Sequence, residues 1–435
     1  MIINEGTKIV KKIIFMVDMY YPKPRAVGIC VHNVAQEMIN LGYEVHVIAY
    51  KQNNEECEEE FEGVFVHRIA MRLDMKMQEY GESHLDSALG KISYKAAGII
   101  RKIQKLFFLP WFPLVSPLTV NRYYRKTLSL NREYDFDCII ATYLPPEPLF
   151  AGAMVKKKLK NIKYGAYILD SLITQSGQKY LPSKLIEKLT WKFEKMIYET
   201  ADKTYNPECL RDHYQSDKYL KYRDKMIFLD VPYFKPKQPI SKQILHDISK
   251  KHLVYLGTLI KNSRNPEYIY RLFTKINKSG LYQLHFYTRG SCEDDLLKYQ
   301  IESGDAVLRH GFVTHAEIDN IIATSDYLIN LSVKDAAMIS GKIFEYMSTG
   351  KPVIHFYYKD NDACLRYLER YELRIAIKID EQLFESNVRR LKKFLTESYG
   401  KTVEPNSLIE TFKGNMPIQS AQHFDALARG DYLED

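Results

Sequence analysis

Apolar segments typical of buried strands alternate with helical patterns along this chain, in two successive series. In the first half such segments fall at 13–17, 44–49, 64–69, 138–142 and 164–169, with helical patterns that include 29–40 and 183–200. The second series has strand-like segments at 252–257, 284–287, 306–309, 327–331, 353–356 and 374–377. Strands that alternate with helices favour parallel sheets covered on both faces. The sequence therefore predicts an α/β protein with two such sheets.

The boundary between the two series is marked by prolines and lysines in the segment VPYFKPKQPISK, which begins at Val231. We place a hinge there. The expected organisation is a first Rossmann-like domain over 1–235 and a second over 236–400. The apolar pattern weakens after residue 402, so 401–435 is either a helix that packs back on the first domain or a partly disordered tail.

Composition narrows the classes of function. Lysine and arginine exceed aspartate and glutamate by 62 − 54 = 8, a mild excess that suits an anionic partner without demanding nucleic acid. None of the six cysteines forms a C-x-x-C pair, so neither a zinc site nor a disulfide framework is indicated. No signal-peptide pattern and no apolar run of membrane-spanning length occurs, which predicts a cytoplasmic protein.

The segment SGKIFEYMSTGKPVIH, from Ser340 to His355, predicts a short helix, a glycine stop and a buried strand. Ser340 suits the N-cap, Gly350 suits the left-handed position after the helix, and Pro352 prevents the helix from resuming. The start of such a helix directs backbone N–H groups towards a bound anion. Glu345, one turn in, could accept hydrogen bonds from sugar hydroxyls. The segment therefore suggests a nucleotide-sugar site.

Two common phosphate cradles are absent from the sequence. No G-x-G-x-x-G follows any predicted strand, and no G-x-x-x-x-G-K-[ST] occurs. These absences argue against a dinucleotide dehydrogenase and a P-loop enzyme. Open α/β sheets still bind ligands at the carboxyl ends of their strands, so two such domains predict a ligand cleft.

An aromatic segment, FFLPWFPLV at Phe107–Val115, is too short and too rich in proline to span a bilayer. Basic residues flank it at Arg101, Lys102, Lys105, Arg122, Arg125 and Lys126. Apolar aromatics beside basic residues suit the surface of an anionic membrane. The alternative is a loop that packs on its own domain.

Taken in order, several segments resemble a GT-B glycosyltransferase of the large family 4 type, and in particular bacterial enzymes of capsular or other surface-polysaccharide synthesis. The opening strand, loop, helix and second strand of that family resemble the first long segment of this chain, FMVDMYYPKPRAVGICVHNVAQEMINLGYEVHVIAY. VYLGTLIKNSRNPEYIYRLF and RHGFVTHAEIDNIIATSDYLINL resemble elements of its donor domain, and SGKIFEYMSTGKPVI resembles its signature helix and strand. The resemblance implies two Rossmann-like domains with parallel sheets facing a central cleft.

On the donor side, the resemblance makes Glu345 the second glutamate of the E-x7-E motif, which binds the ribose hydroxyls. The alternative is a surface glutamate paired with Lys342, three positions away. Ser340, Gly341 and Lys342, at the start of the helix, are expected to meet the diphosphate.

The first glutamate of the same motif, which contacts the donor sugar in the family, is replaced here by Ala337. Asp335, Lys334 or the backbone amides of 338–340 are the candidate substitutes. The sequence therefore supports the nucleotide end of the site better than the sugar end.

Cations are expected in the loop that follows Gly257. The family often has arginine directly after this glycine, whereas this chain has Thr258. Lys261 and Arg264 remain as the residues that would neutralise the leaving diphosphate, with Arg264 preferred. The alternative is that both are surface cations with no ligand.

On the acceptor side, Asp170 ends a predicted strand and is expected to orient the acceptor hydroxyl or act as the base. Such an aspartate also commonly caps a turn. Gly28 and Arg25 lie in the first loop, where the family brings backbone close to acceptor or phosphate. The alternative for Gly28 is that it only permits the turn. Asp360-Asn361-Asp362 resembles a D-x-D metal motif, but we interpret it as a polar loop and expect no metal.

These observations predict a metal-independent glycosyltransferase with no cofactor beyond its nucleoside diphosphate sugar, and the resemblance implies that it retains the anomeric configuration. Its acceptor would be a glycan or a lipid-linked molecule, and it would be cytoplasmic with peripheral membrane contact through 101–126. The alternatives are a nucleotide-sugar epimerase or phosphorylase on the same fold, and a degenerate, non-enzymatic subunit of a glycosylation complex.

Overall fold

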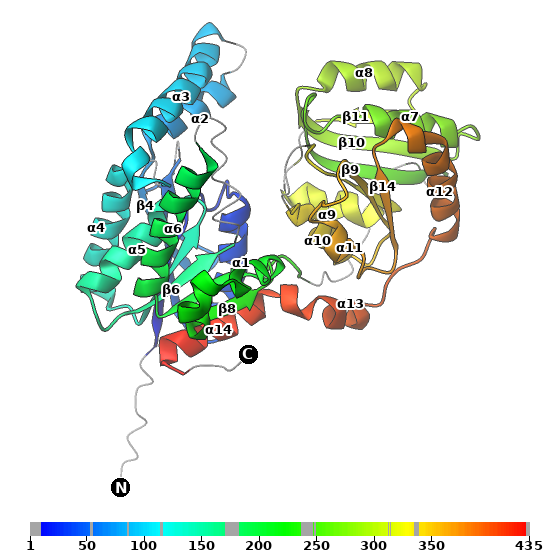
Figure 1. The fold of residues 1–435 in the computed structure, drawn as a ribbon. Helices are drawn as coiled ribbons and strands as arrows, with labels where there is room; N and C mark the ends of the chain where they lie inside the picture. Colours follow the sequence, from blue (N-terminus) through cyan, green and yellow to red (C-terminus); the bar gives the residue numbers. More distant parts are fainter. Residues whose placement is uncertain are drawn as a thin grey trace. The chain divides into compact units, whose positions relative to one another are not determined.

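The computed structural model describes residues 10–52, 55–84, 87–113, 116–169, 182–235, 247, 249–311, 313, 315–334 and 339–431. The chain divides into two compact units, Met1–Tyr233 with Gly414–Asp435, and Phe234–Lys413 (Figure 1). The second unit extends past the predicted limit of residue 400, because Phe412 stacks on Phe234 within it, with ring centroids 4.9 Å apart.

The first unit contains an eight-stranded sheet in the order β3-β4-β2-β1-β5-β6-β7-β8. Its strands are β1 (Lys12–Met16), β2 (Glu44–Lys51), β3 (Glu58–Phe61), β4 (Val64–Ala70), β5 (Cys138–Tyr143), β6 (Lys163–Ile168), β7 (Lys203–Pro207) and β8 (Met226–Leu229). All neighbouring pairs are parallel except the β3–β4 pair. The strand order reverses direction between β1 and β5.

Helices cover both faces of this sheet. They are α1 (Ala26–Asn40), α2 (Leu73–Ser83), α3 (Ala88–Phe107), α4 (Pro117–Tyr134), α5 (Glu147–Lys158), α6 (Ser183–Thr200) and α14 (Pro417–Arg429). Ile13 and Phe15 of β1 pack in the core formed with α1 and α14, whereas Ile14 and Met16 pack in the core formed with α4, α5 and α6. This alternation of buried side chains on both faces explains the continuous apolar run of the strand.

The C-terminal helix α14 belongs to the first unit although α13 (Pro405–Phe412) belongs to the second. The Phe424 ring packs 4.7 Å from that of Tyr205 and 5.1 Å from that of Tyr167. Tyr43 donates a hydrogen bond of 2.6 Å from its hydroxyl to Asp425. The segment treated as one tail in the sequence therefore has two parts with different partners.

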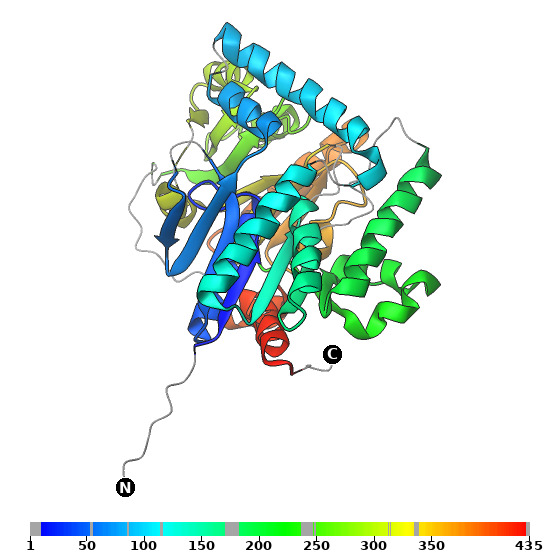
Figure 2. The same ribbon diagram turned by 90° about the vertical axis from the view of Figure 1, so that its left-hand side faces the viewer.

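The helices α2 and α3 form a pair that extends past the end of the first unit's sheet, with α3 as its long member (Figure 2). Helix α3 ends at Phe107, and a short 3-10 turn covers Leu109–Trp111. No helix among the described residues combines the length and the apolar character of a membrane span.

The second unit contains a six-stranded, wholly parallel sheet in the order β11-β10-β9-β12-β13-β14. Its strands are β9 (Lys251–Leu259), β10 (Tyr282–Gly290), β11 (Val307–His310), β12 (Tyr327–Leu331), β13 (Val353–Tyr357) and β14 (Arg374–Lys378). Its helices are α7 (Glu267–Ile276), α8 (Glu293–Glu302), α9 (His315–Thr324), α10 (Gly341–Met347), α11 (Leu365–Leu368), α12 (Phe384–Glu397) and α13. The predicted α/β class is confirmed in both units.

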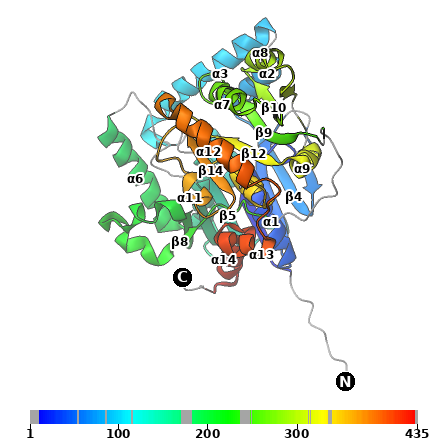
Figure 3. The same ribbon diagram turned by 90° about the vertical axis from the view of Figure 1, so that its right-hand side faces the viewer.

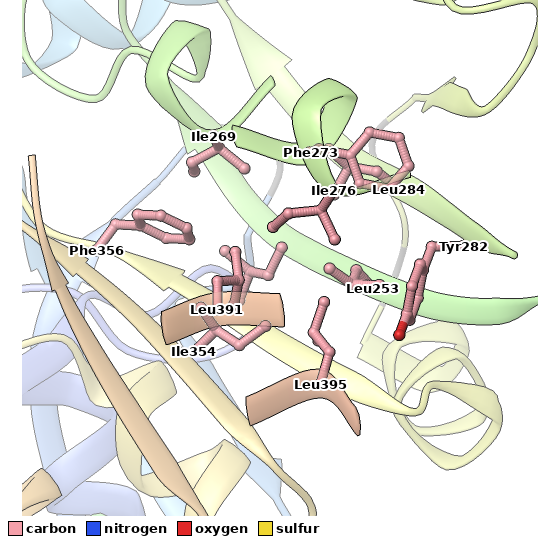
Figure 4. Close-up of a pocket in the computed structure, with 11 residues that line it drawn as sticks. Leu253, Ile269, Phe273, Ile276, Tyr282, Leu284, Ile354, Phe356, Leu391 and Leu395 are labelled. Carbon is pink, nitrogen blue, oxygen red and sulfur yellow. The ribbon is translucent and has the colours of Figure 1, made fainter. Parts of the chain in front are cut away.

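Helices α7 and α12 lie side by side across one face of this second sheet (Figure 3). Between them and the strands lies an apolar cavity of about 10 Å³, lined by side chains such as Phe273, Leu391 and Leu253 (Figure 4). This volume is about that of one water-sized sphere, and the lining offers no polar partners. The cavity is therefore a packing void of the core and holds no ligand site.

Candidate functional site

The carboxyl ends of β9 and β12 define the topological switch point of the second unit, because the strand order reverses between them. In doubly wound sheets, ligands bind in the crevice at this point. The loop after β9 carries Lys261 and Arg264, and the connection after β12 leads into α10. The two predicted donor-site segments are therefore brought to one edge of one sheet.

Arg264 is held by its own backbone in the loop after β9. Its N–H donates to the Ile260 carbonyl at 2.8 Å, and the Ile260 N–H donates to its carbonyl at 3.1 Å. The Lys334 N–H, from the end of β12, donates to the carbonyl of neighbouring Ser263 at 3.0 Å. These bonds tie the loop after β9 to the connection that precedes α10.

The guanidinium group of Arg264 is partly buried, and its Nε is buried without a hydrogen-bond partner. Among the described residues, Arg264 forms no ion pair. Its charge acts on the Cys364 thiol, whose pKa burial raises to about 12 and the arginine partly lowers. A partly desolvated guanidinium with no carboxylate partner among the described residues suits an anionic ligand.

Asp362 accepts hydrogen bonds from three directions beneath this edge. His355 Nε2 lies 3.3 Å from its Oδ1, the Cys364 N–H donates to the same oxygen at 2.8 Å, and the Ser332 hydroxyl donates to Oδ2. Burial alone would raise the pKa of Asp362, but the hydrogen bonds from His355, Ser332 and the Cys364 N–H bring it below its usual value. The carboxylate therefore ties β12, β13 and the following loop together.

The segment Asp360-Asn361-Asp362, interpreted from the sequence as a polar loop, lies in a turn, and its last side chain is buried. Asp360 pairs with Lys378 at 2.7 Å on the surface, whereas the Asp362 side chain is 6% exposed. With His355 and Cys364, Asp362 places three ligand-type atoms within 4.8 Å of one another. The same atoms are joined by the hydrogen bonds described above, so the cluster is satisfied as a hydrogen-bond network.

Ser340 connects this network to α10. It occupies the N-cap position, as predicted, but its side chain makes no capping bond. Its hydroxyl donates to Asn330 Oδ1 at 3.1 Å, and its N–H donates to Cys364 Sγ at 3.4 Å. Asn330 Nδ2 in turn lies 2.8 Å from His355 Nδ1. The start of α10 is thus fixed by buried side chains of two neighbouring strands.

Lys342 and Glu345 follow Gly341 on α10 and face one another. Lys342 Nζ lies 3.8 Å from the Glu345 carboxylate, and the side chains are 33% and 26% exposed. The pairing that the sequence left open is therefore present. A role for either residue in nucleotide binding stays a prediction, and Ala337 and Asp335 lie outside the described residues.

Lys261 and Gly257 are the other residues predicted on the β9 side. Lys261 is 62% exposed and pairs with Asp295 at 3.3 Å, so it is a less available cation than Arg264. Gly257 has φ of +153°, a conformation that side chains disfavour, and a Cβ there would lie 3.2 Å from the Tyr255 hydroxyl. Lys261 also borders a polar pocket of about 370 Å³ that Lys334 helps to line.

In the first unit, Arg25 occupies the N-cap of α1 and pairs with Asp18 at 3.5 Å. Gly28 lies within α1, where an added Cβ would lie 2.0 Å from the Met19 carbonyl oxygen. The glycine is therefore required for the close approach of α1 to the loop after β1. The predicted base, Asp170, lies outside the described residues.

Asp18 is a candidate that sequence reasoning missed. It follows β1 at the switch point of the first sheet, is 5% exposed, and has a buried Oδ1 with no hydrogen-bond partner in the part of the chain that the structure describes. Burial raises its pKa to about 6, although the Met19 N–H and Arg25 act in the opposite direction. A carboxylate with such a pKa can exchange a proton near neutral pH. Its position directly after the first strand was the available signal in the sequence.

Comparison with solved structures defines the fold class. The catalytic domain of starch synthase IV from Arabidopsis thaliana, bound to ADP and acarbose, is 12% identical, with a TM-score of 0.55 over 97% of this chain and 99% of that chain. HepE of Anabaena, in complex with UDP and glucose, is 11% identical, with a TM-score of 0.55 over 97% and 100%. A UDP-N-acetylglucosamine 2-epimerase is 12% identical, with a TM-score of 0.50 over 98% and 99%. The chain has the GT-B fold.

Sequence comparison then points to one family within that fold. The model of the glycosyl transferases group 1 family matches residues 250–373, from β9 through α11. No curated protein is detectably similar in sequence over the chain. Residues 250–373 are therefore similar to the group 1 glycosyl transferases, within a chain that has the GT-B fold.

Proposed function

We propose that this protein transfers a sugar from a nucleoside diphosphate sugar to an acceptor hydroxyl, with the donor held by the second unit. The observation that carries the proposal is the partly buried Arg264 guanidinium at the switch point, inside the segment that matches the group 1 glycosyltransferases. Retention of anomeric configuration follows from the family resemblance alone.

The chemistry assigned to Arg264 is stabilisation of the leaving group. As the bond between the anomeric carbon and the donor phosphate breaks, negative charge builds on the diphosphate. A positioned cation stabilises that charge more in the transition state than in the ground state. We propose that Arg264, assisted by Lys342, performs this role without a metal ion, and that Lys261 contributes less because Asp295 already neutralises it.

Glu345 is proposed to bind the ribose hydroxyls, which requires its carboxylate to move from Lys342 or to share it. The 3.8 Å separation and the partial exposure of both side chains make this exchange inexpensive, since exposed ion pairs contribute about 0–1 kcal/mol. Lys342 would then be released towards the diphosphate. In the free protein, the ion pair therefore keeps the Lys342 ammonium and the Glu345 carboxylate next to the proposed donor site.

The acceptor side is proposed to lie in the first unit, with Arg25, Gly28 and Asp170 as predicted and Asp18 added. The acceptor is proposed to be a glycan or a lipid-linked molecule of surface-polysaccharide synthesis, used at the inner face of the cell membrane. This part rests on the family resemblance and on the exposed apolar surface described below.

The donor-site proposal is tested by titrating UDP, GDP and ADP into the full-length protein by calorimetry. Arg264→Ala removes a charge-assisted contact of about 1.5–3 kcal/mol, so the Kd of the preferred diphosphate is expected to rise about 10- to 150-fold. Arg389→Ala, an exposed arginine of α12, is the matched control and should bind like the wild type. Equal affinity of Arg264→Ala and wild type would remove Arg264 from the site.

Turnover separates the competing functions. A panel of nucleotide sugars is incubated with and without membrane lipid extract, and both free nucleotide and new glycan are measured. Transfer requires the extract, whereas an epimerase converts the nucleotide sugar alone. A non-enzymatic subunit leaves every nucleotide sugar intact in both conditions.

A further inference from the structure

The outer face of α3 is an exposed apolar stripe. Its members recur at spacings of three, four and seven residues, and each is more than half exposed: Leu89 (69%), Ile92 (63%), Ile99 (59%), Ile103 (58%) and Leu106 (65%). Phe107 (74%) and Trp111 (55%) extend it at the C-terminal end. Single exposed apolar residues are normal on a protein surface, whereas a continuous stripe of this length on one helix is not.

The opposite face of α3 is occupied by α2. An added Cβ at Gly81 of α2 would lie 2.8 Å from Tyr94 of α3, and one at Gly90 of α3 would lie 1.9 Å from the carbonyl oxygen of His84 at the end of α2, so the two helices approach closely there. The Ser93 hydroxyl donates to the Met77 carbonyl at 2.9 Å, and Arg101 Nε lies 3.1 Å from Asp74. Because α2 holds this face, the apolar stripe is left directed away from the helix pair.

The charge of α3 has one sign. Its twenty residues contain no aspartate or glutamate, and four of its lysines are exposed: Lys91, Lys95, Lys102 and Lys105. Within the described part of the chain none of these lysines forms an ion pair. The surface therefore presents apolar and cationic groups together, which is the pattern of an interfacial helix.

This placement extends the surface predicted from the sequence over 101–126 towards the start of α3. Arg122 donates to the Ala70 carbonyl at 2.8 Å, and Lys126 pairs with Glu58, so these cations of α4 are engaged within the unit. Arg101 is likewise engaged by Asp74. Lys102, Lys105 and Phe107 of the predicted segment remain exposed, and the apolar stripe continues back along α3 to Leu89.

We propose that α3 lies flat on an anionic lipid bilayer, with the stripe from Leu89 to Leu106 among the acyl chains and the lysines at the phosphates. A second copy of this chain is the competing occupant, because the stripe also has heptad spacing. Two copies would bring Lys95 and Lys102 against the same lysines of the other helix, with no carboxylate on either α3 to compensate. Charge complementarity therefore favours the anionic bilayer.

The dimensions of α3 suit this occupant. A helix of 20 residues is about 30 Å long, and interfacial helices bury their apolar face about 5–10 Å into the headgroup boundary. Trp111 and Phe107 stand at one end, where aromatic rings favour the membrane interface. The inference concerns the first unit alone and does not depend on the donor site.

The test is flotation of the full-length protein with vesicles of phosphatidylcholine alone and of phosphatidylcholine with one third phosphatidylglycerol. Binding to the anionic vesicles at low salt, with loss at high salt, is expected. Ile99→Asp with Ile103→Asp should abolish it. Lys95→Gln with Lys102→Gln should weaken partition about five-fold per lysine, since each contributes about RT ln 5 at an anionic surface. Ile301→Asp, on α8 of the second unit, is the matched control, because Ile301 is 73% exposed.

Fluorescence gives a second readout. The chain has two tryptophans, so Trp191→Phe leaves Trp111 as the reporter, and its emission should shift to shorter wavelength on anionic vesicles. No flotation at low salt, or flotation that the α3 variants leave unchanged, would overturn the proposal. A dimer in light scattering that the Ile99→Asp, Ile103→Asp variant disperses would assign the stripe to a second copy instead. Nucleotide titrations of the same variants should match wild type whichever result is obtained.

Discussion

Replacing the buried carboxylate of Asp18 by an amide is predicted to stabilise the first unit. The side chain is 5% exposed, its Oδ1 lacks a partner, and Arg25 approaches only to 3.5 Å from an exposed position. Burial raises the pKa from 3.8 to about 6. The folded state therefore binds this proton more tightly than the unfolded state does. At a pH between 3.8 and about 6, unfolding releases the proton.

The direction of the pH dependence follows from that proton. The folded unit loses stability as the pH rises from 3.8 through about 6. The loss amounts to roughly 3 kcal/mol at pH 7 and roughly 1.5 kcal/mol at pH 5. Asp18→Asn cannot ionise, so its unfolding free energy should exceed that of the wild type by up to these amounts, with a smaller advantage at the lower pH.

The assay is urea unfolding followed by tryptophan fluorescence. Both tryptophans, Trp111 and Trp191, lie in the first unit, so the signal reports the unit that contains Asp18. Asp212→Asn, at an exposed position, is the control and should leave the midpoint unchanged. A variant Asp18→Asn that is no more stable than wild type at pH 7.5, or whose advantage does not shrink at pH 5, would refute the reasoning. A stable but inactive Asp18→Asn would show that the ionised group is retained for function.

Two further predictions concern the same unit. Gly28→Ala places a Cβ 2.0 Å from the Met19 carbonyl oxygen, so it should lower the unfolding free energy of the first unit by about 3 kcal/mol or more. Gly98→Ala on α3 adds a Cβ that meets nothing within 4 Å, so it should raise that free energy by about 0.5–1 kcal/mol. The midpoints of urea unfolding compare the two variants with the wild type. Burial lowers the pKa of His46 and of His67, which lie 2.9 Å apart, so both histidines should reduce stability as the pH drops below 6.5. Urea unfolding of Asp18→Asn, which removes the opposite pH dependence of that carboxylate, measures this effect, and a flat profile between pH 6.5 and 5.5 in this variant would contradict it.

The secondary structure was accessible from the sequence because periodicity reports burial directly. The prediction placed a helix at 183–200 and a strand at 327–331, and both agree with α6 and β12. The β3 strand was not predicted, since EEEF has no apolar alternation, and it forms by pairing antiparallel with β4 at the edge of the sheet. Pairing with a neighbour, rather than any local preference, makes this segment a strand.

The site was less accessible, because its partners are distant in sequence. Arg264 was selected from a loop pattern, but its missing counter-charge depends on which side chains surround it. Asp362 was interpreted as part of a polar loop, and its burial depends on contacts with His355 of β13 and Ser332 after β12. Asp18 followed a strand plainly in the sequence, yet only its burial distinguishes it from an ordinary turn residue.

The division of the first unit between the two ends of the chain has a consequence for synthesis. The contacts of Phe424 with Tyr205 and of Asp425 with Tyr43 join residues that leave the ribosome far apart in time. The second unit, Phe234–Lys413, is contiguous and can complete its fold while the first still exposes the surface that α14 will cover. A chain interrupted after residue 413 would therefore carry a complete second unit and an incomplete first unit, so folding of the whole molecule waits for the last helix.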